Sequence, residues 1–346
     1  MTIAIISDTH IGDRSSRLLD KNGTFTSSNP CYCELKEKIF NFTKRKPLEF
    51  LVLSGDIMDF SINSIDSSIN LSRPFFQQLS SDKLTKRIVY IPGNHDKQVW
   101  DGVQWDTSII GNLSDNRPAK QFTRIQPAVI SSFNTIELEG IYPKSKGKYG
   151  NIFLKGLFDT SFNNPQMILA YPNLYIKMEE ETILVTHGHM FETIWTIIST
   201  LFKGVSGLPD NIGFKELEEW NIPLSSMIAT GLGSAGKVSD LFYRIEREIY
   251  ENKSSLLSQT LGSILPRIKD ELNLPWYKKI LIPDWLIKKI ILAVAMKAED
   301  PREYNDYLGD KNNKQNFSVF FEASKKELER LKLPPVNKII FGHTHH

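Results

Sequence analysis

Cysteine is almost absent from this sequence, whose 346 residues include only Cys31 and Cys33. Their spacing fits neither a CxxC zinc site nor a disulfide framework, and two thiols in a chain of this length suit a reducing compartment. The N-terminus, MTIAIISDTH, lacks the basic start, apolar core and cleavage site of a signal peptide. An uncharged apolar stretch of ~20 residues is also missing, so we expect no transmembrane helix and a cytoplasmic location.

An excess of charge of one sign is missing too. Lys and Arg number 42 and Asp and Glu number 40, which leaves a net charge of +2. This basic bias is too weak for a dedicated nucleic-acid binder, although it would not hinder an anionic substrate. The sequence shows no internal repeat or low-complexity tract. Its length allows one large domain or a core domain with an insertion.

Short apolar runs bounded by turn residues predict buried strands. These runs are Ile3–Ser7, Phe50–Leu53, Arg87–Ile91, Thr182–Val185 and Lys338–Phe341. The apolar spacing over Glu34–Thr43 predicts a helix that packs on a sheet. From about residue 123 to 155, β-branched, aromatic and polar residues alternate between Gly and Pro turns, which predicts antiparallel strands and hairpins.

Helical patterns separated by glycines and prolines follow His189. The predicted helices lie near 191–203, 214–220, 236–253, 284–298 and 317–332. We interpret 191–335 as a mainly helical insertion or lid, and 1–190 together with 336–346 as an α/β core. The stretches Phe191–Phe202 and Trp285–Met296 fit packed helices of that insertion. An apolar lid or a peripheral membrane contact is the alternative for them.

Five polar blocks end or follow the predicted strands. They read DTH (8–10), GDIMD (55–59), GNHD (93–96), HGH (187–189) and GHTH (342–345). Six of the seven histidines lie in these blocks, and His346 follows the last one. Strands that point the same way deliver their carboxyl-end loops to one edge of a sheet, where open α/β folds bind ligands. Asp, Asn and His together suit borderline divalent metals such as Mn, Fe or Zn.

Each block has an ordinary explanation when it is taken alone. Asp8 could cap a helix, the pair Gly55–Asp56 is a common turn, and the pair Gly93–Asn94 is a hairpin signal. The terminal histidines could be mistaken for part of a tag, although a tag would be a longer uniform run. What distinguishes the sequence is the presence of all five blocks in one order.

That order resembles the signature of the calcineurin-like metallophosphoesterase superfamily, D-x-H, GD-x-x-D, GNHD, H-x-H and GH-x-H. The resemblance covers Asp8 to His345 except for the helical stretch near 191–335. It implies a four-layer α-β-β-α sandwich with mixed sheets, to which the helical insertion is added. It also implies a hydrolase that cleaves a phosphate ester or anhydride with two divalent metal ions. Manganese is the expected metal, and Fe, Zn, Ni and Mg are the alternatives.

The resemblance further implies a role for each matching residue. A hydroxide between the two metals would attack phosphorus in line with the leaving oxygen. The implied ligands are Asp8, His10 and His345 for the first metal, Asn94, His187 and His343 for the second, and Asp56 as the bridge between them.

The remaining residues of the blocks are implied to act beside the metals. His95 would donate a proton to the leaving group, since the pKa of an imidazole lies near neutrality. Asp59 would orient His95, and Asp96 could share that task. His189 could be a ligand, a hydrogen-bond partner of the ligands or a substrate contact. Arg14 could reach a substrate phosphate with its forked donors, or be an ordinary surface arginine.

At two positions the sequence differs from known branches of the superfamily, which limits the branches to which it could belong. Phe60 follows Asp59 where protein phosphatases have Arg, and His95 stands where bacterial UDP-diacylglucosamine diphosphatases usually have Arg. We expect a small-molecule phosphoesterase or diphosphatase whose substrate is a nucleotide, a nucleotide sugar or lipid-linked. A DNA or RNA nuclease and a non-catalytic metal-binding scaffold are the alternatives. Basic residues on one rim of the site would favour a nuclease, and an apolar pocket beside it would favour a small molecule.

Overall fold

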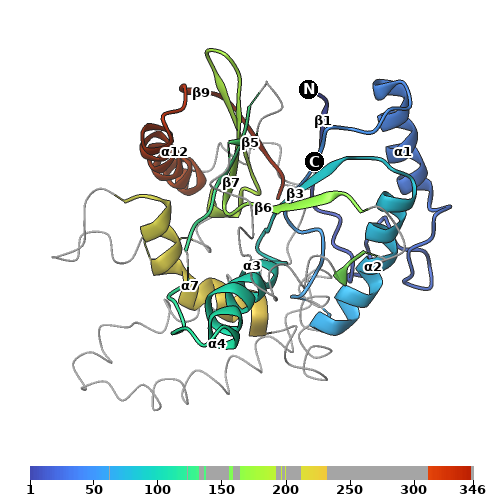
Figure 1. Cartoon of the computed structure of the whole chain (residues 1–346), viewed down its shortest axis with the longest axis horizontal. Coiled ribbons are helices and arrows are strands. Elements are labelled where there is room, and N and C mark those ends of the chain that lie inside the picture. Colours follow the sequence, from blue (N-terminus) through green and yellow to red (C-terminus); the bar gives the residue numbers. More distant parts are fainter. Residues whose placement is uncertain are drawn as a thin grey trace.

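Two β-sheets form the centre of the computed structural model of the chain (Figure 1). The first sheet has the order β1-β2-β3-β6, and all its strand pairs are parallel. Its strands are β1 (Ile3–Ile6), β2 (Phe50–Ser54), β3 (Arg87–Ile91) and β6 (Gln166–Leu169).

The second sheet is mixed and has the order β5-β4-β7-β8-β9. The pairs β4–β7 and β8–β9 are parallel, whereas β4–β5 and β7–β8 are antiparallel. Its strands are β4 (Ala128–Ser131), β5 (Ile136–Glu137), β7 (Asn173–Lys177), β8 (Thr182–Thr186) and β9 (Val336–Phe341).

The structure describes residues 1–61, 63–122, 124–131, 136–137, 156–158, 164–191, 196, 199, 212–231 and 311–343. The predicted helices near 236–253 and 284–298 and most of the predicted hairpin region lie outside these residues. So do His345 and His346. Among the described residues, no helix combines the length and apolar character that crossing a membrane requires.

Alternation along the strands explains why the sheets stack. In β2, Leu51 and Leu53 belong to one apolar core, whereas Phe50 and Val52 belong to another. Successive side chains of a strand point to opposite faces, so a continuously apolar strand must be covered on both sides. The core that contains Phe50 and Val52 also contains residues of β4, β7 and β8, and it therefore lies between the two sheets.

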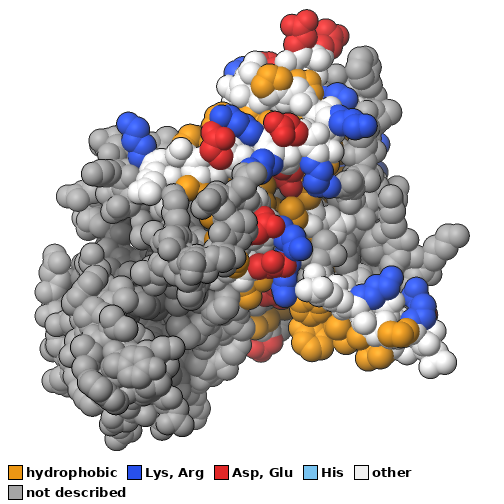
Figure 2. Space-filling model, turned by 90° about the vertical axis from the view of Figure 1, so that its left-hand side faces the viewer, with side chains coloured by type: hydrophobic (Ala, Val, Ile, Leu, Met, Phe, Trp, Pro, Cys, Tyr) orange, Lys and Arg blue, Asp and Glu red, His pale blue; other side chains and the backbone are white. Residues whose placement is uncertain are grey.

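Helices cover the two outer faces (Figure 1). The first sheet carries α1 (Pro30–Thr43), α2 (Ile65–Ser81) and α3 (Gln98–Gln104), and α3 continues into the π-helix η1 (Trp105–Ile110) and α4 (Gly111–Ser114). The second sheet carries α7 (Phe214–Gly231) and α12 (Lys311–Leu331). On the side of α12 and α7, basic and acidic side chains are intermixed over the described surface (Figure 2). The four layers expected of the fold are therefore present.

Local signals account for the first helix. The side chain of Asn29 accepts hydrogen bonds from the backbone N–H groups of Cys31 and Tyr32, and Pro30 occupies the first turn. Lys44 ends the helix in the left-handed conformation. The predicted helix over Glu34–Thr43 is confirmed, and it begins four residues earlier than expected because of this cap.

Of the other predictions from sequence, some are confirmed, and some elements of the structure were not predicted. The five predicted strands are confirmed with small shifts at their ends, and α7 and α12 confirm the helices expected near 214–220 and 317–332. The strands β6 and β7 and the helices α2 and α3 were not predicted. That residues 191–335 form a unit distinct from the core stays a prediction.

Candidate metal centre

Loops at the carboxyl ends of five strands meet at one edge of the two sheets. Three follow the parallel strands β1, β2 and β3, whose carboxyl ends share an edge. The other two follow β8 and β9, which are parallel to each other. The backbone N–H of His343 donates to both carboxylate oxygens of Asp8 at 2.9 Å. The first and last of the five sequence blocks therefore lie side by side.

Two glycines make this close approach sterically feasible. A Cβ atom at Gly55 would overlap the ring of His187, and one at Gly93 would overlap the carboxylate of Asp56. Gly55 also has a φ of +83°, which side chains rarely adopt. The glycines of the second and third blocks are needed because side chains of the site fill the space that any larger residue would take.

Four residues of the site have a positive φ although they are not glycines. The angles are 54° for Asp8, 44° for His10, 52° for Asp56 and 69° for His343. This conformation is uncommon outside glycine and costs on the order of 1–3 kcal/mol for each residue. Strain that gathers where polar side chains meet favours a functional role for them.

The tightest group of metal-type donors surrounds His187. Its Nδ1 lies 3.0 Å from the carbonyl oxygen of Ser54, so in the neutral ring Nδ1 carries the proton and Nε2 is an acceptor. That Nε2 lies 3.0 Å from Asp56 Oδ2 and 3.1 Å from both Asn94 Oδ1 and His343 Nδ1. Four electron-rich atoms this close repel one another unless protons or a cation lie between them.

A second group consists of the carboxylates of Asp8 and Asp56 and the ring of His10. One donor atom from each of them lies within 4.8 Å of the others. The Nδ1 of His10 is 2.9 Å from Asp59 Oδ2, and its Nε2 is 3.8 Å from Asp56 Oδ2. An imidazole that binds a metal commonly donates its other N–H to a carboxylate in this way. His345, the remaining predicted ligand of this group, is outside the described residues.

Asp56 is common to both groups. Its Oδ1 accepts the backbone N–H of His95 at 2.8 Å. Its Oδ2 is buried, and the Nε2 atoms of His187 and His10 lie 3.0 Å and 3.8 Å from it. A buried carboxylate is costly unless positive charge lies beside it, and a divalent cation would supply that charge in place of the ring protons. The mixed carboxylate, imidazole and amide donors therefore fit a borderline divalent metal.

The electrostatics of the site favour positive charge. Burial alone would lower the pKa of His187, but the carboxylates of Asp56 and Asp8 raise it to about 9. Burial also opposes the charge on His10, yet Asp59 and Asp56 raise its pKa to about 10. Burial would raise the pKa of Asp56, but the facing histidines hold it well below its usual range. A metal that binds here must displace protons from the rings.

His95 lies beside the two groups. Its Nδ1 is 2.6 Å from the hydroxyl of Ser61 and 3.0 Å from Asp59 Oδ2, and its ring meets that of His10 edge to face. Burial would lower the pKa of His95, but Asp59 and Asp56 raise it. His10, Asp59 and His95 could by distance alone hold a cation, but hydrogen bonds to Asp59 already explain their approach. With Nδ1 engaged, Nε2 is the nitrogen that a substrate could use.

Asp96 ties the loop after β3 to the loop after β2. Its Oδ1 accepts the backbone N–H of Gly93 at 2.6 Å. Its Oδ2 accepts the N–H of Ile57 at 2.8 Å and the hydroxyl of Tyr90 at 2.5 Å. Burial and the nearby Asp56 raise the pKa of Asp96. Because Asp96 is fully buried, this geometry suits the alignment of Asp56 with its neighbours rather than contact with a substrate.

The two remaining predicted residues differ in burial. His189 is buried in the short helix η2 (His189–Phe191), and its ring centroid lies 5.6 Å from that of His187. Arg14 is exposed on the loop after β1. Among the described residues, neither belongs to the groups of metal-type donors.

Three supporting residues were missed by sequence reasoning. Ser61 lies two positions after Asp59, and its backbone N–H donates to Asp59 Oδ1 at 2.9 Å, a spacing typical of Asp turns that could have indicated it. Ser54 acts through its carbonyl oxygen and Tyr90 acts from inside a strand, so neither left a signal in the motif.

A comparison with protein-family models gives the same family as the motifs. The model described as calcineurin-like phosphoesterase matches residues 1–222, which include four of the five blocks. Comparisons with curated proteins and with solved structures returned no match. The match spans more than half of the chain, and the two-sheet fold and the donor groups agree with it. The chain therefore belongs to the calcineurin-like phosphoesterases, a family of metal-dependent phosphoesterases.

Proposed function

We propose that the protein hydrolyses a phosphate ester or anhydride of a small molecule with two divalent cations, for which manganese is the preferred candidate. The observation that carries this proposal is the convergence of donors on the buried Oδ2 of Asp56. The Nε2 atoms of His187 and His10 lie 3.0 Å and 3.8 Å from it, and each of these rings belongs to a different donor group. A carboxylate placed between two donor groups is suited to bridge two cations.

The two groups would divide the ligands between the cations. Two cations bound in this way would lower the pKa of a bound water, which would serve as the nucleophile, and would offset the negative charge of the phosphoryl oxygens. The ligands would be Asp8, His10 and His345 on one side, Asn94, His187 and His343 on the other, and Asp56 shared.

The residues beside the metals would handle the leaving group. His95 would carry a proton on Nε2 and donate it to the leaving oxygen, because the carboxylates around it favour its charged form. Asp59 would fix the ring through Nδ1, since it is fully buried and cannot itself reach a substrate. Asp96 would keep Asp56 and His95 in register through its contacts with both loops.

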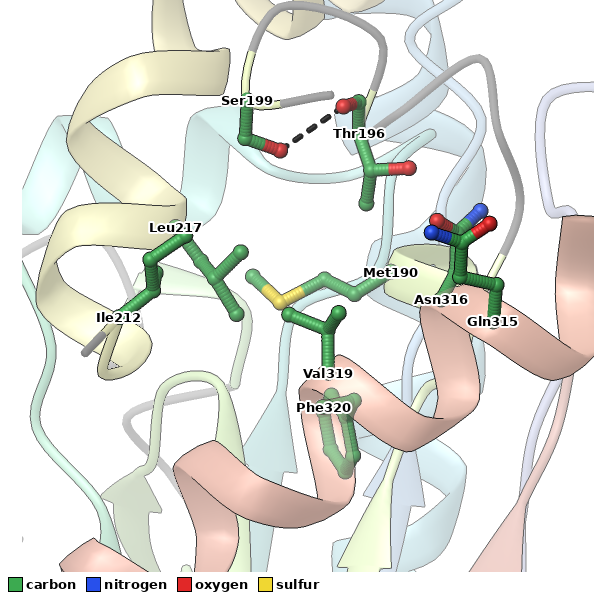
Figure 3. Close-up of a pocket in the computed structure, with 9 residues that line it drawn as sticks. All are labelled: Met190, Thr196, Ser199, Ile212, Leu217, Gln315, Asn316, Val319 and Phe320. Carbon is green, nitrogen blue, oxygen red and sulfur yellow. Dashed lines mark hydrogen bonds between the residues drawn. The ribbon is translucent and has the colours of Figure 1, made fainter. Parts of the chain in front are cut away.

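A small pocket without charged residues begins one position after His189. It opens beside Met190, which directly follows His189, and lies between η2, α7 and α12 (Figure 3). Its volume of about 30 Å³ is enough for water-sized groups only, so it is too small to hold a substrate. Its lining residues are Met190, Thr196, Ser199, Ile212, Leu217, Gln315, Asn316, Val319 and Phe320.

The cation nearest to His95 along the chain is not available to a nucleic acid. Lys97 is buried, and its Nζ lies 3.1 Å from Glu218 Oε1 on α7. Burial would lower the pKa of Lys97, but Glu218 and Asp101 raise it. The pair therefore joins α7 to the loop after β3 instead of adding positive charge to a binding surface.

A substrate panel tests the proposal. The purified protein would be assayed with Mn²⁺ on p-nitrophenyl phosphate, bis-p-nitrophenyl phosphate, a nucleotide-sugar diphosphate and single-stranded DNA. We expect turnover of a small-molecule substrate that disappears on chelation and returns with Mn²⁺. Asp56→Asn should reduce it by about 100-fold or more, because one substitution weakens both cation sites.

The matched control is Asp115→Asn, which removes an exposed carboxylate paired with Arg117 on the surface and should change nothing. Cleavage of DNA without any small-molecule turnover would replace the proposal by the nuclease alternative. A protein that turns over none of the four substrates, or whose activity survives Asp56→Asn, would overturn it.

A further inference from the structure

Two acceptors compete for one N–H group of His95. Its Nδ1 lies 2.6 Å from the hydroxyl oxygen of Ser61 and 3.0 Å from Asp59 Oδ2. The carboxylate oxygen can only accept, so its presence beside Nδ1 favours the ring form that carries a proton there. The nearer partner of that proton is the hydroxyl of Ser61.

Asp59 Oδ2 already has another donor. The Nδ1 of His10 lies 2.9 Å from the same oxygen, so Oδ2 faces two imidazole rings. The other oxygen, Oδ1, is 2.8 Å from the hydroxyl of Ser61 and 2.9 Å from its backbone N–H. One carboxylate thus supports two rings, one of them directly and the other largely through a serine.

The contacts of Ser61 fix the direction of this chain of hydrogen bonds. Its hydroxyl has one proton, and the adjacent Asp59 Oδ1 can only accept it. The lone pairs of the hydroxyl are then directed to the N–H of His95. Ser61 is 92% buried, and its N–H bond to Asp59 holds it in place, so little water competes for these bonds.

We propose that Ser61 is a positioning residue for His95. Its hydroxyl oxygen accepts the Nδ1–H of His95, and its hydroxyl proton is donated to Asp59 Oδ1. Asp59 Oδ2 is then left to accept the Nδ1–H of His10. The inference rests on the proposed function, in which His95 protonates the leaving group. Loss of the hydroxyl leaves Asp59 Oδ2 to hold both rings. The His95 ring then loses its closest restraint, whereas the cation ligands keep theirs.

The test compares leaving groups. p-Nitrophenolate leaves readily without a proton, whereas phenolate leaves poorly, so a defect in proton donation affects phenyl phosphate far more than p-nitrophenyl phosphate. For Ser61→Ala we expect kcat on phenyl phosphate to fall by about tenfold and kcat on p-nitrophenyl phosphate by less than about threefold. Bound manganese should be unchanged. Ser61→Thr retains a hydroxyl and should keep the wild-type ratio between the two substrates.

Ser68→Ala is the matched control. Ser68 is also buried, and its hydroxyl donates to the backbone carbonyl of Asp59 at 2.5 Å without contacting either ring. A merely structural weakening around Asp59 should lower both rates equally in this variant and leave their ratio unchanged.

A second readout needs no activity. In the ¹H–¹⁵N spectrum of the Zn²⁺-loaded and the metal-free protein, the Nδ1–H of His95 is identified by its absence in His95→Gln. We expect Ser61→Ala to shift this signal upfield and speed its exchange with water, and Ser68→Ala to leave it in place. An unchanged signal together with an unchanged ratio of rates would overturn the inference. If the wild-type protein hydrolyses neither ester, the signal alone decides whether Ser61 holds the ring, and the proposed function is judged separately by the four-substrate panel.

Discussion

The two sheets hold their site residues in different ways. On the side of the first sheet, the loops after β1, β2 and β3 brace one another through buried side chains. Asp59 holds His10 and His95, and Asp96 joins the loop of Asp56 to the turn at Gly93. These bonds stay within loops of one sheet.

On the side of the second sheet, the site residues depend on the first. His187 is held by the carbonyl oxygen of Ser54, and His343 by the carboxylate of Asp8. The hydroxyl of Ser54 also donates to the carbonyl oxygen of Thr186 at 2.9 Å, which joins the ends of β2 and β8. The comparison teaches that the first-sheet loops form a self-supporting frame, whereas the second-sheet histidines are placed only when the sheets dock.

The largest effect is expected from breaking the frame at Asp96. Asp96→Ala leaves the backbone N–H groups of Gly93 and Ile57 and the hydroxyl of Tyr90 buried without their acceptor. We expect a loss of about 3–5 kcal/mol in the free energy of unfolding, measured by urea denaturation. A loss under about 1 kcal/mol would show that the loops do not depend on this carboxylate.

Asp59→Asn sharpens the comparison within the site. An amide oxygen in place of Oδ2 would turn the amide NH2 towards the N–H and hydroxyl of Ser61, which are themselves donors. The negative charge beside both rings is also lost, so His10 and His95 both lose support. We expect kcat to fall by about 100-fold and metal affinity at the His10 group by about tenfold, with the His187 group unaffected. Kinetics and metal titration measure the two losses. An equal loss of metal affinity at the His10 and His187 groups would contradict the view that Asp59 supports only the first.

Tyr175→Phe probes the second-sheet side away from the metals. The hydroxyl of Tyr175 lies 2.5 Å from Glu327 Oε2 and joins β7 to α12. We expect a destabilisation of about 1–2 kcal/mol from this lost bond to a buried carboxylate. The metal content should be unchanged, because His187 and His343 are held by Ser54 and Asp8 at the edge of the first sheet. Metal loss in a folded variant would argue that α12 helps to place the histidines.

The smallest effect belongs to Asp82, where α2 ends on the outer side of the first sheet. Burial would raise its pKa, but hydrogen bonds from Lys36, Gln78 and Tyr32 lower it. A carboxyl with a lowered folded-state pKa stabilises the fold above its unfolded pKa of about 3.9, and this stabilisation fades as the pH falls through the folded value.

Asp82→Asn should therefore cost less than about 1 kcal/mol at pH 7, since the carboxylate is partly exposed to solvent. The difference from wild type should shrink as the pH is lowered from about 6 to 3. Urea midpoints of both proteins, measured in EDTA over that range, give the comparison. A stability difference that grows towards low pH would contradict a lowered pKa of Asp82 in the folded protein.

The sequence predicts well those elements that a local pattern of apolar residues and turn residues determines. The runs Phe50–Leu53 and Arg87–Ile91 are apolar at every position or nearly so, and both became strands buried on two faces. The polar residues after them follow glycines that allow sharp turns, and side chains from all five blocks lie together in the structure where these are described.

Tertiary contacts decide the rest. Helix α2 is rich in serine and contains Pro74, so its local propensity is weak, and the burial of Phe75, Phe76 and Leu79 holds it on the first sheet. Strand β6 pairs with β3, which lies far from it in the sequence. The carbonyl of Ser54 could not be predicted as a partner of His187 because any residue supplies the same atom.

The metal content of matched variants tests the central claim most directly. After equilibration with Mn²⁺ and removal of free metal, the metal bound per chain would be measured by mass spectrometry for the wild type, His10→Ala and His187→Ala. With Asp56 shared by two cation sites, we expect about two Mn²⁺ in the wild type and about one in each variant. A wild-type chain that keeps no metal under any condition, or variants that bind as much as the wild type, would contradict it.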